Sequence, residues 1–259
     1  MSSSMSGASC GSAAPMRARA AVATALYAGR TAIPVLSSSP PLTFRQTGPH
    51  AVHLVSTAAA PLGGDVLEVD LDVAPGTKLD VGSVASTVVL PGRGESTMLI
   101  TARVGAGATL RFTPEPTVLA AGCDHRMLVR LALAEGAHVF WREEIVFGRY
   151  GEAPGRCHAR FDATRAGRPL LRQEFTVGDP ALDASTAVYG DARCVGTTLV
   201  TGPDPGRREA VVGAGVAVLP LAGPGTLVSA LGGDAVELRR RLEWGESLAL
   251  GLAGAAHPA

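Results

Sequence analysis

The sequence is poor in aromatic residues and has no excess of charge of either sign. Only 4% of its 259 residues are Phe, Trp or Tyr, and 23 Lys and Arg balance 23 Asp and Glu. Without a basic field, the chain has no electrostatic means of holding nucleic acid or an anionic membrane. The scarcity of aromatics argues against a carbohydrate-binding cleft, where sugar rings stack on aromatic side chains.

Cysteine is also sparse, and several catalytic and membrane signatures are missing. The four cysteines are widely scattered and form no CxxC pair, at Cys10, Cys123, Cys157 and Cys194. This spacing argues against a disulfide framework or a zinc ribbon, so we expect a reducing, cytoplasmic location. The sequence has no run of about 18 apolar residues, no glycine-rich phosphate loop, no GxSxG elbow and no HExxH motif. It therefore predicts no membrane span and none of these catalytic sites.

What the sequence does contain is a turn pattern that occurs three times. Gly76, Gly107 and Gly136 lie 31 and 29 residues apart. The same apolar positions recur around each glycine, seven residues before it (Val69, Ile100, Val129) and five after it (Val81, Phe112, Trp141). Period-two spacing on both sides of a glycine turn indicates strand, turn and strand with one buried face. A repeat of about 30 residues predicts stacked β-units, as in solenoids.

The rest of the chain completes the prediction of a mainly β, β-helix-like stack of many strands with about two α-helices. Residues 1–21 are rich in Ser, Ala and Gly, and we expect a disordered tail there, followed by a single β domain over 22–259. Asp234 resembles a helix N-cap with Glu237 three residues on, and Gly245 resembles a stop, which predicts a helix over about 234–244. A second helix is expected near 181–189.

Histidine and cysteine do not predict a metal centre. In a strand, the neighbours Cys157 and His158 point to opposite faces, and we interpret Cys157 as a packed small hydrophobe. The Cys123-Asp124-His125 segment is the best local cluster of soft ligands, but two ligands do not make a closed site. The carboxylates are of more interest, although ion pairing with nearby arginines is the simpler role for each.

Five short segments stand out by their order and spacing. They are Pro40-Pro41-Leu42, Gly63-Gly64-Asp65, the aromatic–Pro–Glu–Pro run at 110–116, the Glu–strand–Gly-Arg–Gly-Glu run at 143–152, and Gly167-Arg168-Pro169-Leu170 before Glu174. Together they resemble the urease accessory protein D family (UreD, also called UreH). The match extends from about Arg30 to Gly202, and residues 1–29 have no counterpart that can be placed.

The resemblance implies a β-helix-like solenoid with two helices and no catalysis of its own. It also implies a role in nickel insertion into apo-urease. Family members bind the urease apoprotein on one side and an all-helical accessory partner (UreF-type) on the other, and that partner holds the nickel-delivering GTPase (UreG-type). No tightly bound cofactor is expected, and Ni²⁺ would be a transient cargo. Low charge and high apolar content suit a large interface with such partners.

A relay protein must release its ion, so carboxylates and water suit the task better than soft thiolate cages. The metal-passage candidates are the acidic residues of the family-like segments: Asp65, Glu115, Glu143, Glu144, Glu152 and Glu174. Arg149 is expected to position Glu144 or Glu152. Two alternatives stay open at this point. One is a β-solenoid enzyme acting on polysaccharides, with paired acids across a cleft, and the other is a ligand-binding β-module with no metal role.

Overall fold

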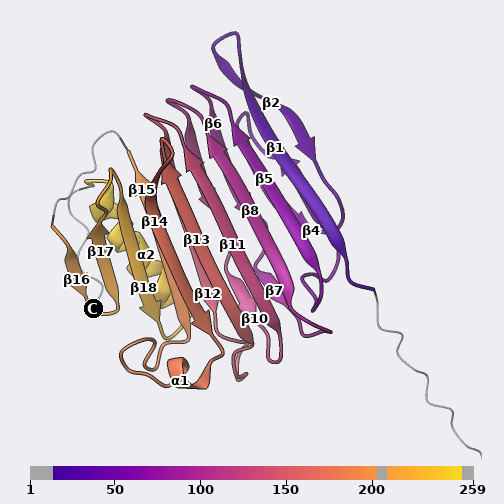
Figure 1. Cartoon of the computed structure of the whole chain (residues 1–259), viewed down its shortest axis with the longest axis vertical. Coiled ribbons are helices and arrows are strands. Elements are labelled where there is room, and N and C mark those ends of the chain that lie inside the picture. The colour runs from indigo at the N-terminus through magenta and orange to yellow at the C-terminus, as the bar shows by residue number, and fades with distance from the viewer. Residues whose placement is uncertain (1–13, 203–208, 253–259) are drawn as a thin grey trace, which may run out of the picture.

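The chain folds into two stacked β-sheets, with one helix packed on an outer face (Figure 1). The computed structural model describes residues 14–202 and 209–252. These residues include eighteen strands and two helices. The mainly β prediction with about two helices is therefore confirmed.

One sheet has seven strands. Their bounds are β1 Arg17–Tyr27, β2 Arg30–Ser37, β5 Val66–Val73, β8 Ser96–Val104, β11 Asp124–Leu133, β13 Arg156–Arg165 and β14 Arg168–Val177. They lie in the order β14-β13-β11-β8-β5-β1-β2. The five central strands are parallel, and the two edge strands, β14 and β2, are antiparallel to their neighbours.

The other sheet has eleven strands and extends further than the first. Their bounds are β3 Leu42–Gln46, β4 Ala51–Ser56, β6 Lys78–Ser83, β7 Thr87–Val89, β9 Thr109–Thr113, β10 Thr117–Leu119, β12 His138–Val146, β15 Cys194–Thr201, β16 Val211–Gly213, β17 Val216–Pro220 and β18 Thr226–Gly232. The main path runs β16-β17-β18-β15-β12-β9-β6-β4-β3, while β10 pairs with β12 and β7. Strands β4, β6, β9 and β12 are parallel.

The three repeated glycines carry the chain from one sheet to the other. Gly76, Gly107 and Gly136 have φ of 70°, 64° and 69°, the left-handed region that glycine adopts without steric cost. The two strands of each unit therefore lie in different sheets, and equivalent strands of successive units pair. The register aligns the repeated positions, Val69 with Ile100 with Val129 and Val81 with Phe112 with Trp141. The predicted solenoid is confirmed, with coils flattened into two layers.

Aromatic stacking across the units strengthens the core between the sheets. The rings of Phe112 and Trp141 are stacked with their centroids 4.0 Å apart, and Phe161 from the opposite sheet meets Trp141 edge-on at 5.8 Å. Such pairs contribute about 0.5–1.5 kcal/mol beyond the burial of their surface. This cluster fixes the position of β12, which carries three of the charged residues discussed below.

The helices differ in extent from the prediction. α1 is a single turn, Pro180–Asp183, and α2 runs over Ala235–Ala249 on the outer face of the eleven-stranded sheet. The predicted N-cap is confirmed, because Oδ1 of Asp234 accepts from the Glu237 N–H at 2.8 Å. The predicted stop at Gly245 is wrong. Gly245 faces the sheet, where a Cβ would lie 2.5 Å from Cγ1 of Val228, so it serves close packing inside the helix.

The predicted tail is wrong at its C-terminal end. β1 begins at Arg17 and pairs in parallel with β5. Its inward residues Ala18, Ala20 and Val22 are at most 5% exposed. Small side chains at alternate positions fill a narrow layer of the core, and their Ala-rich composition concealed the strand. The remainder of the predicted tail, residues 1–13, lies outside the described residues.

Candidate functional site

The eleven-stranded sheet is interrupted beside β12. β9 pairs with β12 from His138 to Trp141, and β10 resumes the pairing at Ile145. In the described structure, no strand pairs with this side of β12 across 142–144. Pro114 and Pro116 occupy the gap in the facing segment, and proline has no N–H to donate to a ladder. Glu115, between them, donates its N–H to Oγ of Ser83 at 2.9 Å.

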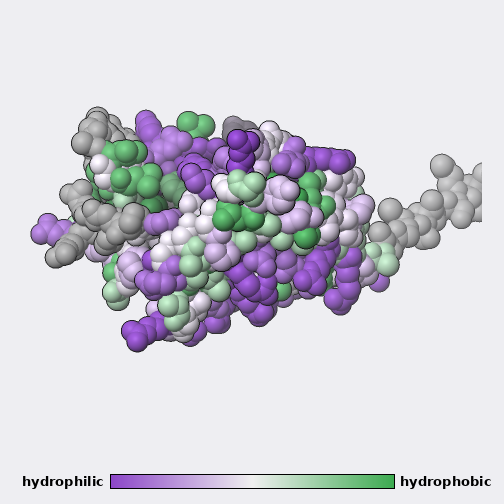
Figure 2. Space-filling view, turned by 90° about the horizontal axis from the view of Figure 1, so that it is seen from above, coloured by the Kyte–Doolittle hydropathy of each residue, from purple (hydrophilic) through white to green (hydrophobic). Residues whose placement is uncertain are grey.

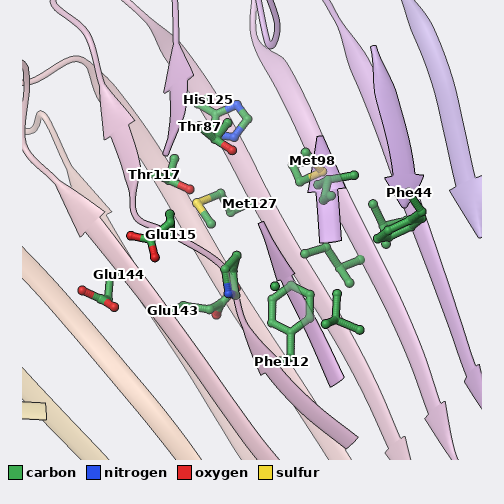
Figure 3. A pocket seen from close by; sticks show the side chains of 16 residues that line it. Phe44, Thr87, Met98, Phe112, Glu115, Thr117, His125, Met127, Glu143 and Glu144 are labelled. Atoms are coloured by element: carbon green, nitrogen blue, oxygen red, sulfur yellow. The ribbon is translucent and has the colours of Figure 1, made fainter. Parts of the chain in front are cut away.

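A cavity of about 60 Å³ lies between the sheets at this interruption (Figure 3). Apolar residues from both sheets line most of it, including Phe44, Val81, Met98, Phe112 and Met127. Its polar lining consists of Thr87, Thr117, His125, Glu115, Glu143 and Glu144. We call this space the inter-sheet cavity. Three of the six predicted carboxylates line it.

Glu143 and Glu144 are neighbours on β12, so their side chains leave opposite faces of the strand. Glu143 lies on the inner side, where it also borders Met127, Phe161 and Thr197. Burial raises the pKa of Glu143 from 4.5 to about 7. It has no ion-pair partner among the described residues, and its charge state therefore changes near neutral pH.

Glu144 lies on the outer side, beneath α2, and its side chain is fully buried. Arg239 of α2 donates through Nη2 to Oε1 of Glu144 at 2.7 Å. The same guanidinium reaches Glu115 at 3.4 and 3.5 Å. Burial raises the pKa of Glu144, and Arg239 opposes that shift. Glu115 and Glu144 are thus held together by one arginine.

A second buried ion pair fastens α2 to the sheet. Arg142 of β12 donates to both carboxylate oxygens of Glu246, with Nε at 2.7 Å from Oε1. The hydroxyl of Thr198 donates to the same Oε1 at 2.6 Å. Arg142 and Glu246 are only 9% and 4% exposed. Their mutual bonding satisfies charges that would be costly to bury alone.

The other predicted carboxylates lie away from the cavity. Asp65 is 3% exposed and accepts from the backbone N–H groups of Met16 and Leu62, each at 2.8 Å. Its role is therefore to fix the start of β1 beside the 62–65 turn. Glu174, on β14, pairs with Arg160 at 2.8 Å.

Arg149 holds Glu152 in a surface loop, with Nε at 2.9 Å from Oε2. This pairing lowers the pKa of Glu152 to about 2. Arg149 was expected to position either Glu144 or Glu152. In the structure it binds Glu152, and Glu144 is bonded to Arg239 instead.

The buried thiols are unsuited to metal binding, because the thiolate is the form that binds a metal. Burial raises the pKa of the Cys123 and Cys194 thiols to about 11, and that of Cys157 further still. Burial also lowers the pKa of His125 to about 4, so its imidazole is neutral near pH 7, and its Nδ1 is engaged by Oγ of Ser96 at 2.8 Å. Within residues 14–202 and 209–252, no three His, Cys, Asp or Glu side chains cluster closely enough to hold a metal ion.

Three charged residues of this site were not predicted from the sequence: Arg142, Arg239 and Glu246. A signal for Glu246 does exist, because it falls four residues after Leu242 on the apolar stripe of α2, where a charge requires a buried partner. No comparable signal marks Arg239, which contacts segments about 95 and 124 residues earlier in the chain. Neither helix of the described structure has the length and apolar character that crossing a membrane requires.

Comparisons with known proteins identify the family. The family model described as "UreD urease accessory protein" matches residues 16–257. A urease accessory protein UreD of Frankia casuarinae is 44% identical over 248 residues, covering 84% of this chain and 77% of its own length. The UreD of a Parafrankia species is 45% identical over 259 residues, covering 88% and 87%. UreD 1 of Saccharopolyspora erythraea is 38% identical over 239 residues, covering 88% and 93%. The chain therefore belongs to the UreD family of urease accessory proteins.

Proposed function

We propose that this chain is a non-catalytic scaffold and relay for nickel insertion into apo-urease. In this role it bridges the urease apoprotein to the all-helical accessory partner and, through that partner, to the nickel-delivering GTPase in the cytoplasm. The observation that carries the relay part is the convergence of Glu115, Glu143 and Glu144 on the inter-sheet cavity, at an interruption of the sheet.

The chemistry of these residues fits transfer better than storage. Carboxylate oxygens bind Ni²⁺ less tightly than thiolates do, and an ion on its way must leave each site. The buried thiols stay protonated near neutral pH. Glu143 would be the inner contact point, and Glu115 with Glu144 the outer one. Asp65, Glu152 and Glu174 fall outside this proposed route because each is engaged elsewhere.

The outer face of the seven-stranded sheet supports the scaffold part. Parallel sheets are usually covered on both faces, yet α2 packs on the other sheet and α1 is one turn near β14. In the view of Figure 2, hydrophilic side chains lie along both long sides of the molecule, with paler and apolar side chains between them. A partner protein would complete the covering of this sheet.

A polysaccharide-acting enzyme fits the described surface poorly. Such an enzyme needs paired acids and several sugar-stacking rings on an open face. The chain has six Phe, two Trp and three Tyr, and of these Tyr27 and Tyr150 are exposed, at 76% and 107%. The three acids of the cavity face apolar residues and arginines instead.

Co-purification separates these functions. The tagged chain should capture both the urease apoprotein and the helical accessory partner from cells that express the urease gene set, whereas the tag alone should capture neither. It should have no activity on a panel of glycans. Glycan cleavage, or a failure to retain either urease or the helical partner, would contradict the proposal.

A further inference from the structure

α2 packs on the outer face of the eleven-stranded sheet, and its Arg239 lies at the interruption beside β12. Figure 1 shows the helix on the far side of the sandwich from the seven-stranded sheet. Arg239 projects from this helix to Glu115 and Glu144, and both carboxylates line the cavity. The guanidinium therefore joins the two sides of the gap: Glu144 on β12 and Glu115 in the Pro-Glu-Pro segment.

We propose that Arg239 is a latch that closes the outer end of the inter-sheet cavity, and that the cavity opens when its guanidinium leaves Glu115. This inference rests on the proposed function only in so far as the cavity is the route of Ni²⁺. Closure itself is a property of the chain, and it can be measured without metal or urease.

The two contacts of Arg239 are unequal, and this asymmetry identifies the side that opens. The bond to Glu144 is 2.7 Å long and the Glu144 side chain is 0% exposed, whereas Glu115 lies at 3.4 Å and is 43% exposed. An exposed, long ion pair contributes little to stability. Arg239 can therefore release Glu115 while keeping Glu144.

The second ion pair keeps the helix in place while the latch moves. Arg142 and Glu246 are buried and bonded through both carboxylate oxygens, and Thr198 adds a third bond. Nη1 of Arg142 also lies 4.0 Å from Oε1 of Glu144, so that Glu144 keeps a positive neighbour when Arg239 moves. Opening then needs only a side-chain rearrangement at residues 115 and 239.

Arg239 also hinders the entry of a cation through its positive charge. The guanidinium occupies the carboxylate oxygens that an incoming cation would contact, and it presents a positive charge at the same point. A divalent cation must therefore compete with Arg239 for Glu115, or wait until a partner bound at α2 draws the arginine away. Either event frees the carboxylate of Glu115 at the outer end of the cavity, while Glu144 keeps its bond to Arg239.

Cysteine accessibility tests the latch directly. Val81 lines the cavity and is 3% exposed, so a Val81→Cys chain reports access to the cavity through its reaction with a small cationic thiosulfonate. In that background, Arg239→Gln should speed the modification of residue 81 by about tenfold or more, the scale of one lost charge-assisted hydrogen bond. Glu115→Gln should have the same direction of effect, and Arg239→Lys should stay close to the parent.

Arg241→Gln is the matched control, because Arg241 lies on the same helix but bonds Glu237 and the Leu231 carbonyl. Its rate at residue 81 should equal that of the parent. Cys157, which is 1% exposed in a different cluster, reports general loosening. Equal rates at residue 81 in Arg239→Gln and Arg241→Gln would overturn the latch, and so would parallel acceleration at Cys157. Neither result would touch the proposed function, which co-purification and nickel loading test separately.

Discussion

Exchange of Glu143 for Gln is expected to lower the nickel loaded into urease by about tenfold or more, the scale of losing a charged ligand inside a low-dielectric cavity. Gln keeps the size of the side chain and removes the charge. Glu143 is the acidic residue on the inner side of β12 at the cavity, whereas Glu115 and Glu144 are bonded to Arg239. The measurement is nickel per urease active site, together with urea turnover, after activation with the variant.

Glu174→Gln is the matched control, because Glu174 belongs to the same family-like segments but lies on β14, where it pairs with Arg160 of β13. Nickel loading with this variant should equal that of the parent chain. Both variants should co-purify with urease as the parent does. If Glu143→Gln loads nickel as well as the parent, Glu143 has no part in the relay, although the scaffold role would stand.

The charge of Glu143 also gives the transfer a pH dependence. Its pKa of about 7 means that the ionised, cation-binding form grows between about pH 6 and 8, and nickel transfer should rise with it. The effect on stability has the opposite sign. The folded chain keeps the proton of Glu143 up to about pH 7, while the unfolded chain loses it near pH 4.5. Glu143 therefore lowers the free energy of unfolding as the pH rises from about 4.5 to 7. Glu143→Gln should lack this part of the pH dependence in urea unfolding.

Truncation of Arg142 to Ala should cost about 3–5 kcal/mol of unfolding free energy, the usual cost of leaving a buried charge without its partner. Glu246, on the buried side of α2, would remain with only Thr198 to bond it. The double exchange Arg142→Leu with Glu246→Leu should recover much of the loss, because two apolar side chains replace two paired charges. Urea unfolding followed by circular dichroism measures both.

The control for this prediction is Arg130→Ala, because Arg130 lies exposed on the outer face of β11. It should change the free energy of unfolding by no more than about 0.5 kcal/mol. A loss below about 1 kcal/mol for Arg142→Ala would mean that the Arg142–Glu246 pair does not hold α2, and the fixed helix assumed for the latch would lose its support.

The architecture was accessible from the sequence because it repeats. Each glycine turn fixes the same local geometry, and the apolar positions around it stack in register, as Val81, Phe112 and Trp141 do. Pattern failed where packing decides. Gly245 is the residue type that often ends a helix, but here it lies within α2 and packs closely against Val228 of β18. In β1, the alternation of Ala18, Ala20 and Val22 was hidden in a stretch of small residues.

The site was accessible only in part. The sequence singled out Glu115, Glu143 and Glu144, and the interruption of the sheet follows from Pro114 and Pro116, which cannot donate to a ladder. Local sequence could not show that Glu115 and Glu144 share one arginine, because the charged partners of this site lie far apart in the chain. Arg239 joins Glu115 across 124 residues, and Arg142 meets Glu246 across 104.

Reconstitution of apo-urease tests the central claim most directly. Apo-urease, the helical accessory partner, the GTPase with GTP, and limiting Ni²⁺ would be incubated with and without this chain, and the nickel retained by purified urease would be measured. The account predicts efficient loading and urea turnover only when the chain is present. Equal loading in its absence would contradict the account.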